Sequence, residues 1–205
     1  MWIALRPAIF RAMTSDWLGP LEYLAAAFGI VSVWLSTREH LWAWPTAIVN
    51  VLLYVVVFRS QRLYADMGLQ VVYAIISVYG WWHWARGGPG QQTLPVSRTP
   101  VRQRAVLATI AALGSLVLGT ALNRYTDAAL PWADATLSAT SLVAQWMLTR
   151  KLIENWLVWI VLDVCYVAMF AMKQLWPTAA LYAVFLVLAW MGWRSWHESL
   201  RHQAP

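Results

Sequence analysis

One carboxylate interrupts a long apolar stretch in the second half of the chain, "ENWLVWIVLDVCYV" at 154–167. Asp163 stands there seven residues after Trp156 and four after Trp159. In a helix, the spacing i, i+3, i+7 brings these three side chains onto one face. Two indole rings beside a carboxylate favour a flat organic cation, because cation–π attraction is worth about 2 kcal/mol or more in a desolvated site. We therefore predict a site for a planar cation on this face.

Structural roles compete with that interpretation. Tryptophans near the ends of membrane helices commonly belong to the interfacial belt, which is an alternative role for Trp156. A charged group inside a bilayer costs about 2.5–3.5 kcal/mol on insertion scales and usually lines a cavity or a pathway. Asp163 would instead serve folding alone if it were protonated or paired with another helix.

Other polar and aromatic side chains interrupt the apolar segments of both halves. Five of them are further candidates for contact with a ligand: Asn50, Gln70, Trp44, Tyr73 and Tyr182. Amide side chains also hydrogen-bond between membrane helices, so Asn50 and Gln70 have an alternative role in packing. Gln145 is a weaker candidate of the same kind.

The composition indicates a membrane protein. Of the 205 residues, 60% are hydrophobic and 12% are charged, about half the charged share of a soluble domain. A helix needs roughly 20 apolar residues to cross a bilayer, and irregular backbone is not tolerated in lipid. We therefore predict an all-α polytopic protein with seven transmembrane helices, in the apolar segments at 21–35, 41–58, 67–82, 105–122, 135–149, 156–172 and 177–193.

Several function classes lack support in the sequence. There is no GxxxxGK[ST], GxGxxG, GxSxG or HExxH motif, no nucleophile–base pair in the helices, and no Cys/His cluster of metal-ligand spacing. We expect no enzyme activity, no catalytic residues, no metal, no cofactor and no ATP-driven transport by this chain alone. The net charge of +6 comes from basic residues scattered between apolar segments, which suits anionic lipids rather than nucleic acid.

The two halves of the chain resemble each other at one constant offset, which aligns Trp44 with Trp156 and Tyr54 with Tyr166. We interpret this as a duplication of a three-helix unit. The predicted parts are an N-terminal interfacial segment at 1–20, a first repeat at 21–84, a cytoplasmic loop at 85–104, a linker helix at 105–122, a second repeat at 133–196 and a C-terminal tail at 197–205. Gln70 and Tyr182 occupy equivalent positions of the two copies but differ in chemistry. An asymmetric ligand bound between two pseudosymmetric halves would produce such a difference. Divergence of the two copies without selection would produce it as well.

Four crossings separate equivalent points of the two copies, so both copies have the same orientation. This predicts a parallel 3+1+3 repeat with the kind of pseudosymmetry found in SWEET transporters. Six Lys and Arg residues fall on one side of the membrane and nine of the fifteen on the other. The positive-inside rule then places the N-terminus outside and the C-terminus in the cytoplasm.

The stretch "WPTAIVNVLLYVVVFRSQRLYADMGLQVVYAIISVYGWWHW" at 44–84 strongly resembles the PnuC family of bacterial vitamin transporters. The second half adds a WxxWxxx[ND] motif at Trp156, Trp159 and Asp163, and the ending "TAALYAVFLVLAWMGWRSW". The resemblance covers about 22–196. It implies substrate contact at the three motif residues, and with less support at Asn50 and Gln70. Many relatives have Asn where this chain has Asp163.

The resemblance further implies facilitated diffusion of nicotinamide riboside across the bacterial inner membrane, trapping of the product by a separate cytoplasmic kinase, and a homotrimer in the lipid bilayer. Nicotinamide riboside is a pyridinium cation, which agrees with the chemistry expected of the tryptophans and Asp163. Thiamine is also a flat cation and stays open as the substrate, whereas riboflavin is neutral and larger. A receptor or scaffold without transport activity is the alternative from another class.

Overall fold

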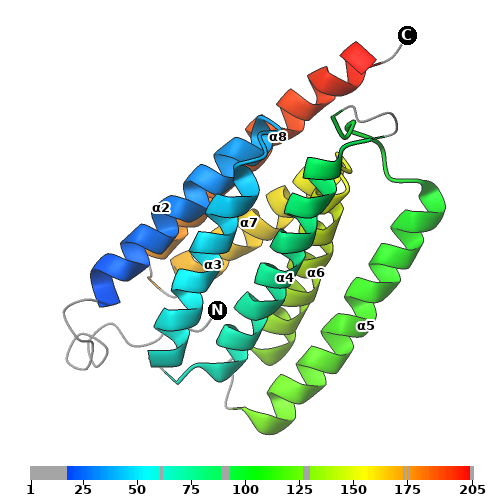
Figure 1. Ribbon diagram of the computed structural model, residues 1–205. Helices are drawn as coiled ribbons and strands as arrows, with labels where there is room; N and C mark the ends of the chain where they lie inside the picture. The colour runs from blue at the N-terminus through cyan, green and yellow to red at the C-terminus, as the bar shows by residue number, and fades with distance from the viewer. Residues whose placement is uncertain are drawn as a thin grey trace.

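A computed structural model describes residues 18–60, 62–88, 93–126, 130–172, 174 and 176–203. Most of the predicted interfacial segment at 1–20 lies outside these residues. The described part is built from helices that follow one another along the chain (Figure 1): α2 (Leu18–Thr37), α3 (Ala43–Ser60), α4 (Tyr64–Arg86), α5 (Val101–Tyr125), α6 (Pro131–Thr149), α7 (Asn155–Met172) and α8 (Trp176–Gln203).

Six of the seven predicted apolar segments lie within one of these helices, and the segment at 41–58 begins two residues before α3. The largest differences are at the ends: α5 begins at Val101, within the predicted loop, and α8 continues to Gln203 through the predicted tail. The tail is helical because it packs on the rest of the protein. Leu200 packs against a buried hydrophobic cluster, and the Ser199 hydroxyl donates a hydrogen bond of 2.6 Å to Glu39 Oε1.

In the described part of the chain, five helices are long and apolar enough to cross a membrane, namely α2, α3, α5, α7 and α8. The other two helices, α4 and α6, are of similar length and are not among these five. Both contribute polar side chains to a cavity inside the molecule, Gln70 from α4 and Ser141 from α6 among them.

Six of the helices form a closed ring around that cavity. Going round it, α2 packs on α3, α3 on α4, α4 on α6, α6 on α7, α7 on α8, and α8 returns to α2. The remaining helix, α5, packs on α6 and lies at the edge of the molecule (Figure 1). The ring encloses the cavity, and α5 connects the two halves of the chain from outside it.

The tight turns that join the helices recur at equivalent positions of the sequence repeat. Glu39 follows α2 with a φ of 54°, and Lys151 follows α6 with a φ of 49°. Arg62 follows α3 with a φ of 57°, and Gln174 follows α7 with a φ of 58°. The members of each pair are separated by the same offset that aligns the two halves of the sequence. Non-glycine residues rarely adopt this left-handed conformation, so two such pairs at one offset agree with the predicted duplication.

Candidate functional site

A cavity of about 740 Å³ lies inside the six-helix ring. It is lined from α2, α3, α4, α6, α7 and α8, and by no described residue of α5. Its volume is within the usual range of about 300–1,000 Å³ for sites that hold small organic molecules. All eight residues that the sequence offered for ligand contact line this one cavity: Trp44, Asn50, Gln70, Tyr73, Trp156, Trp159, Asp163 and Tyr182. Their participation in binding remains a prediction.

The face of α7 that carries the tryptophan motif turns toward the cavity, as the helical spacing predicted. Trp156 is 2% exposed and Asp163 is 3% exposed, whereas Trp159 is half-buried. A belt tryptophan contacts lipid headgroups, but the ring of Trp156 is covered by protein. Trp156 therefore belongs to the interior of the ring.

Two glycines make room for the two innermost tryptophans. A Cβ at Gly80 of α4 would lie 2.3 Å from the ring of Trp44, and a Cβ at Gly192 of α8 would lie 2.5 Å from the ring of Trp156. Real Cβ atoms do not approach other atoms so closely, so glycine is required at both positions. Trp44 and Gly80 are the repeat equivalents of Trp156 and Gly192, and the same indole-on-glycine packing thus occurs in each half.

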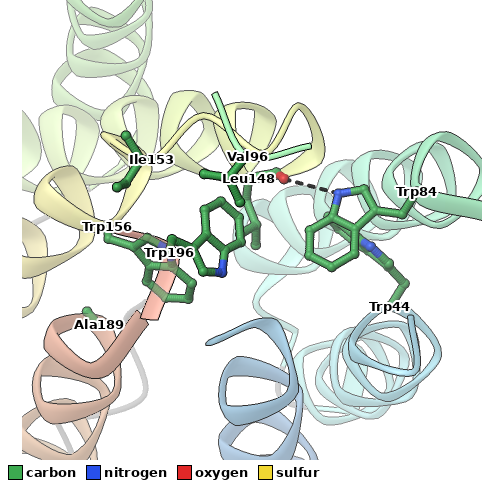
Figure 2. Packing of buried hydrophobic residues seen from close by; sticks show 8 residues of the cluster. All are labelled: Trp44, Trp84, Val96, Leu148, Ile153, Trp156, Ala189 and Trp196. Atoms are coloured by element: carbon green, nitrogen blue, oxygen red, sulfur yellow. Dashed lines mark hydrogen bonds between the residues drawn. The ribbon is translucent and has the colours of Figure 1, made fainter. Parts of the chain in front are cut away.

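Each of these two tryptophans contacts one further tryptophan (Figure 2). Trp44 meets Trp84 edge-to-face at 5.3 Å, and Trp156 meets Trp196 in the same way at 5.3 Å. Trp84 is 7% exposed and Trp196 is fully buried. These four rings close one end of the cavity with aromatic edges, an arrangement that aromatic quadrupoles favour.

The opposite end of the cavity reaches the surface. Its lining there includes Tyr23, which is 80% exposed, and Pro177 at the exposed beginning of α8. Exposed lining residues thus occur where α2 and α8 begin, whereas Trp44 and Trp156 line the end near the α2–α3 and α6–α7 turns.

The amide of Asn50 has a structural role and a place in the cavity at the same time. Its Nδ2 group donates a hydrogen bond of 2.6 Å to the carbonyl of Ala25, which ties α3 to α2. Tyr73 does the same between α4 and α6, because its hydroxyl is hydrogen-bonded to Ser141. Both residues also line the cavity, as do Gln70 and Gln145. Helix packing and ligand contact are therefore compatible for these side chains.

An aromatic cluster forms another wall. Tyr182 of α8 lies 4.6 Å from Tyr166, 5.3 Å from Phe170 and 5.9 Å from Phe185, measured between ring centroids. Only Tyr182 of this group was a candidate from the sequence. The repeat gave a signal for two others, because Tyr166 and Phe170 are identical to Tyr54 and Phe58, which also line the cavity.

The charged residues among the described cavity lining are all acidic: Glu22, Asp66 and Asp163. No lysine, arginine or histidine is among them, although the chain as a whole has a net charge of +6. Sequence reasoning missed Glu22 and Asp66, because acids near helix ends are ordinary. A signal existed for Glu22, since its repeat-equivalent residue is the buried acid Asp134. Among the described residues, the charged lining of the cavity is thus acidic, which agrees with the cation predicted beside Asp163.

Comparison with known proteins agrees with this fold and site. The sequence profile of a family described as "Nicotinamide mononucleotide transporter" matches residues 19–198. The nicotinamide riboside transporter PnuC of Escherichia coli K12 is 24% identical over 208 residues, which cover 89% of this chain and 87% of that protein. The riboflavin/roseoflavin transporter RibM of Streptomyces davaonensis is 25% identical over 171 residues, covering 82% of this chain and 80% of that protein.

A solved structure has the same fold. The crystal structure of the vitamin B3 transporter PnuC superposes with a TM-score of 0.74 and 22% sequence identity, covering 96% of this chain and 87% of that chain. The family and its relatives are transporters rather than enzymes, in agreement with the absence of catalytic motifs. The family profile spans nearly all of the described helices, and the chain therefore belongs to the nicotinamide mononucleotide transporter family, which includes PnuC, and is a multi-pass membrane protein.

Proposed function

We propose that this protein carries nicotinamide riboside into the cell by facilitated diffusion. The observation that carries the proposal is the lining of the cavity, in which acidic and aromatic side chains converge and basic ones are not found among the described residues. Nicotinamide riboside combines a flat pyridinium cation with a polar ribose. The Escherichia coli relative is named as a nicotinamide riboside transporter, and the protein of the matching crystal structure is named as a vitamin B3 transporter.

In this proposal the α7 face binds the pyridinium ring. Trp156 and Trp159 contact the ring through their indoles, and Asp163 supplies the negative charge. The amides of Asn50 and Gln70, which line the same cavity, hydrogen-bond the ribose hydroxyls. Trp44, Tyr73 and Tyr182 complete the enclosure.

We further propose that all seven helices cross the membrane as a parallel 3+1+3 repeat, with α5 as the linker. The paired left-handed turns and the two indole-on-glycine contacts support a duplication. The ring of helices supports crossing by α4 and α6 as well, because the two together fill the ring between α3 and α7, which are apolar enough to span. A homotrimer, and trapping of the product by a separate kinase, are carried over from the family resemblance alone.

The orientation gives a prediction. A reporter enzyme fused after Pro205 should be active in the cytoplasm, because nine of the fifteen basic residues lie on that side in the seven-crossing topology. The α2–α3 and α6–α7 turns would then be cytoplasmic and the cavity mouth periplasmic. Activity of an exported reporter at the same position would reverse this assignment.

Two other vitamins are candidates within the same fold. Riboflavin has support from the relative RibM, which matches this chain about as well as the nicotinamide riboside transporters do. Thiamine, a flat cation, fits the same charge pattern as nicotinamide riboside. Riboflavin is neutral, so it would gain nothing from the charge of Asp163.

Uptake by proteoliposomes tests the proposal. Purified protein in vesicles without ATP, ion gradients or kinase should equilibrate radiolabelled nicotinamide riboside across the membrane, and should not accumulate it. Empty vesicles are the control. If only thiamine or only riboflavin equilibrates, that vitamin replaces nicotinamide riboside as the proposed substrate. Uphill uptake driven by protons or sodium would contradict facilitated diffusion. If none of the three vitamins is transported, a receptor or scaffold becomes the favoured function.

A further inference from the structure

The closed end of the cavity is held by contacts between the two halves of the chain. The Nε1 group of Trp84 in α4 donates a hydrogen bond of 3.3 Å to the carbonyl of Leu148 in α6 (Figure 2). The Nε1 group of Trp196 in α8 donates one of 3.1 Å to the carbonyl of Ser36 in α2. The donors occupy equivalent positions of the repeat, and so do the acceptors. The two bonds are therefore reciprocal: each half donates to the same position of the other, as in an isologous interface.

An ion pair lies at the same interface and joins equivalent positions of the repeat. Lys151 Nζ is 2.7 Å from Glu39 Oε2. The lysine side chain is 5% exposed and the glutamate side chain is 22% exposed. Lys151 also lies over the ring of Trp84, at 4.6 Å from its centroid, and Ser199 donates a hydrogen bond to Glu39. One ion pair thus connects the α2–α3 turn, the α6–α7 turn, α4 and α8.

The closed arrangement also contains unpaired polar groups. In the described part of the chain, Trp44 Nε1, Trp156 Nε1 and Ser77 Oγ are buried without a hydrogen-bond partner, and all three residues line the cavity next to the closed end. A buried donor without a partner destabilises the state in which it occurs. The closed form thus combines a few specific contacts between the halves with three polar groups that have no protein partner.

We propose that Glu39, Lys151, Trp84 and Trp196 form a gate of the transport pathway, and that substrate leaves the cavity when their contacts between the halves separate. This inference rests on the proposed transport function. The gate is closed in this structure, while the cavity reaches the surface at its other end. Trp44 and Trp156 lie between the cavity and the gate, so a ligand in the cavity touches residues that pack directly on it.

The two sides of the gate are anchored differently. The loop before α5 is hydrogen-bonded to the α6–α7 turn, from Ser97 N to Lys151 O at 3.0 Å and from Ile153 N to Ser97 O at 2.9 Å. Glu154 adds a salt bridge of 2.9 Å to Arg104 and accepts hydrogen bonds from Thr99. Among the described residues, this loop makes no such bonds to the α2–α3 turn. Within this proposal, the α2–α3 turn, which carries Glu39, is the side that moves.

Accessibility of a cysteine behind the gate tests this directly. Ser77→Cys, in a Cys165→Ala background, places the single thiol in the cavity lining at a position that is 1% exposed. A membrane-impermeant maleimide is added from the side of the α2–α3 turn. Lys151→Met and Glu39→Gln should each accelerate labelling at least about tenfold, because removing one partner of a buried pair leaves the other uncompensated. Arg38→Gln is the matched control and should leave the rate within about twofold, since Arg38 lies beside Glu39 but contacts Trp34 of its own half.

Unchanged labelling in both variants would overturn the gate. In both variants the dissociation constant of nicotinamide riboside, measured by calorimetry, should stay within about threefold of its value in the protein with the intact ion pair. Loss of binding together with faster labelling would assign these residues to the ligand site or to general folding, and would also overturn the inference. Glu39→Gln carries the test if Lys151→Met does not fold, because glutamine still accepts the hydrogen bond from Ser199. Faster labelling in a protein that transports none of the three vitamins would refute the proposed function and leave the gate in place.

Discussion

Gly80→Ala is expected to destabilise the protein by about 1–3 kcal/mol, the usual cost of forcing extra atoms into a well-packed interior. The added Cβ would lie 2.3 Å from the ring of Trp44, and three ring atoms are within 2.6 Å of it. Trp44 is 1% exposed and rests edge-to-face on Trp84, so it has little room to withdraw. We expect the ring to be pushed into the cavity, which would lower the thermal unfolding midpoint in detergent and weaken ligand binding as well.

Gly68→Ala in the same helix is the matched control. A Cβ at Gly68 meets nothing within 4 Å, and alanine is favoured over glycine inside a helix by about 1 kcal/mol. This variant should be as stable as the original protein or slightly more stable. Gly192→Ala should behave like Gly80→Ala, because its Cβ would meet Trp156 at 2.5 Å. Equal midpoints for Gly80→Ala and Gly68→Ala would show that Trp44 does not occupy the packing position described above.

The helices were predictable because a single apolar segment of this length can satisfy its backbone hydrogen bonds in lipid only as a helix. Hydrophobic runs gave all seven helices, and the 3.6-residue period placed Trp156, Trp159 and Asp163 on one face. That face does line the cavity. Helix ends were less predictable, because they depend on contacts such as that of Ser199 with Glu39, made by residues far apart in the sequence.

The closed end of the cavity was not predicted, for a different reason. A tryptophan in an apolar segment has the same local signal whether it faces lipid or protein, so the burial of Trp156 depended on Gly192 arriving from another helix. The sequence does contain a signal for the ion pair, because Glu39 and Lys151 are oppositely charged residues at equivalent positions of the repeat. Such a pair agrees with the proposed repeat, in which equivalent positions of the two halves meet. Recognising it required knowing that the two turns lie together.

Trp159→Ala should weaken binding of nicotinamide riboside by about 1–3 kcal/mol, from lost cation–π attraction and lost apolar burial, and Trp159→Phe should recover part of the loss. Trp156→Ala should weaken binding by a similar amount and also lower stability, because Trp156 packs on Gly192 and Trp196. Trp34→Ala is the control, since Trp34 is 40% exposed and does not line the cavity. Unchanged affinity in both the Trp156 and the Trp159 variants would leave these residues a purely structural role.

Asp163→Asn separates charge from shape at the centre of the site. Asparagine keeps the size of the side chain and a hydrogen-bonding oxygen but removes the negative charge, in a position that is 3% exposed. Two unit charges at about 4 Å attract by about 4 kcal/mol at an effective dielectric constant near 20, so even a partial loss of this attraction is measurable. Nicotinamide riboside and thiamine, both cations, should lose at least about tenfold in affinity, or about 1.4 kcal/mol, whereas the neutral reduced form of nicotinamide riboside should lose much less. Calorimetric titration of the purified protein with the three ligands measures the difference. Equal losses for charged and neutral ligands would make Asp163 a structural group and remove the electrostatic basis for choosing a cationic vitamin over riboflavin.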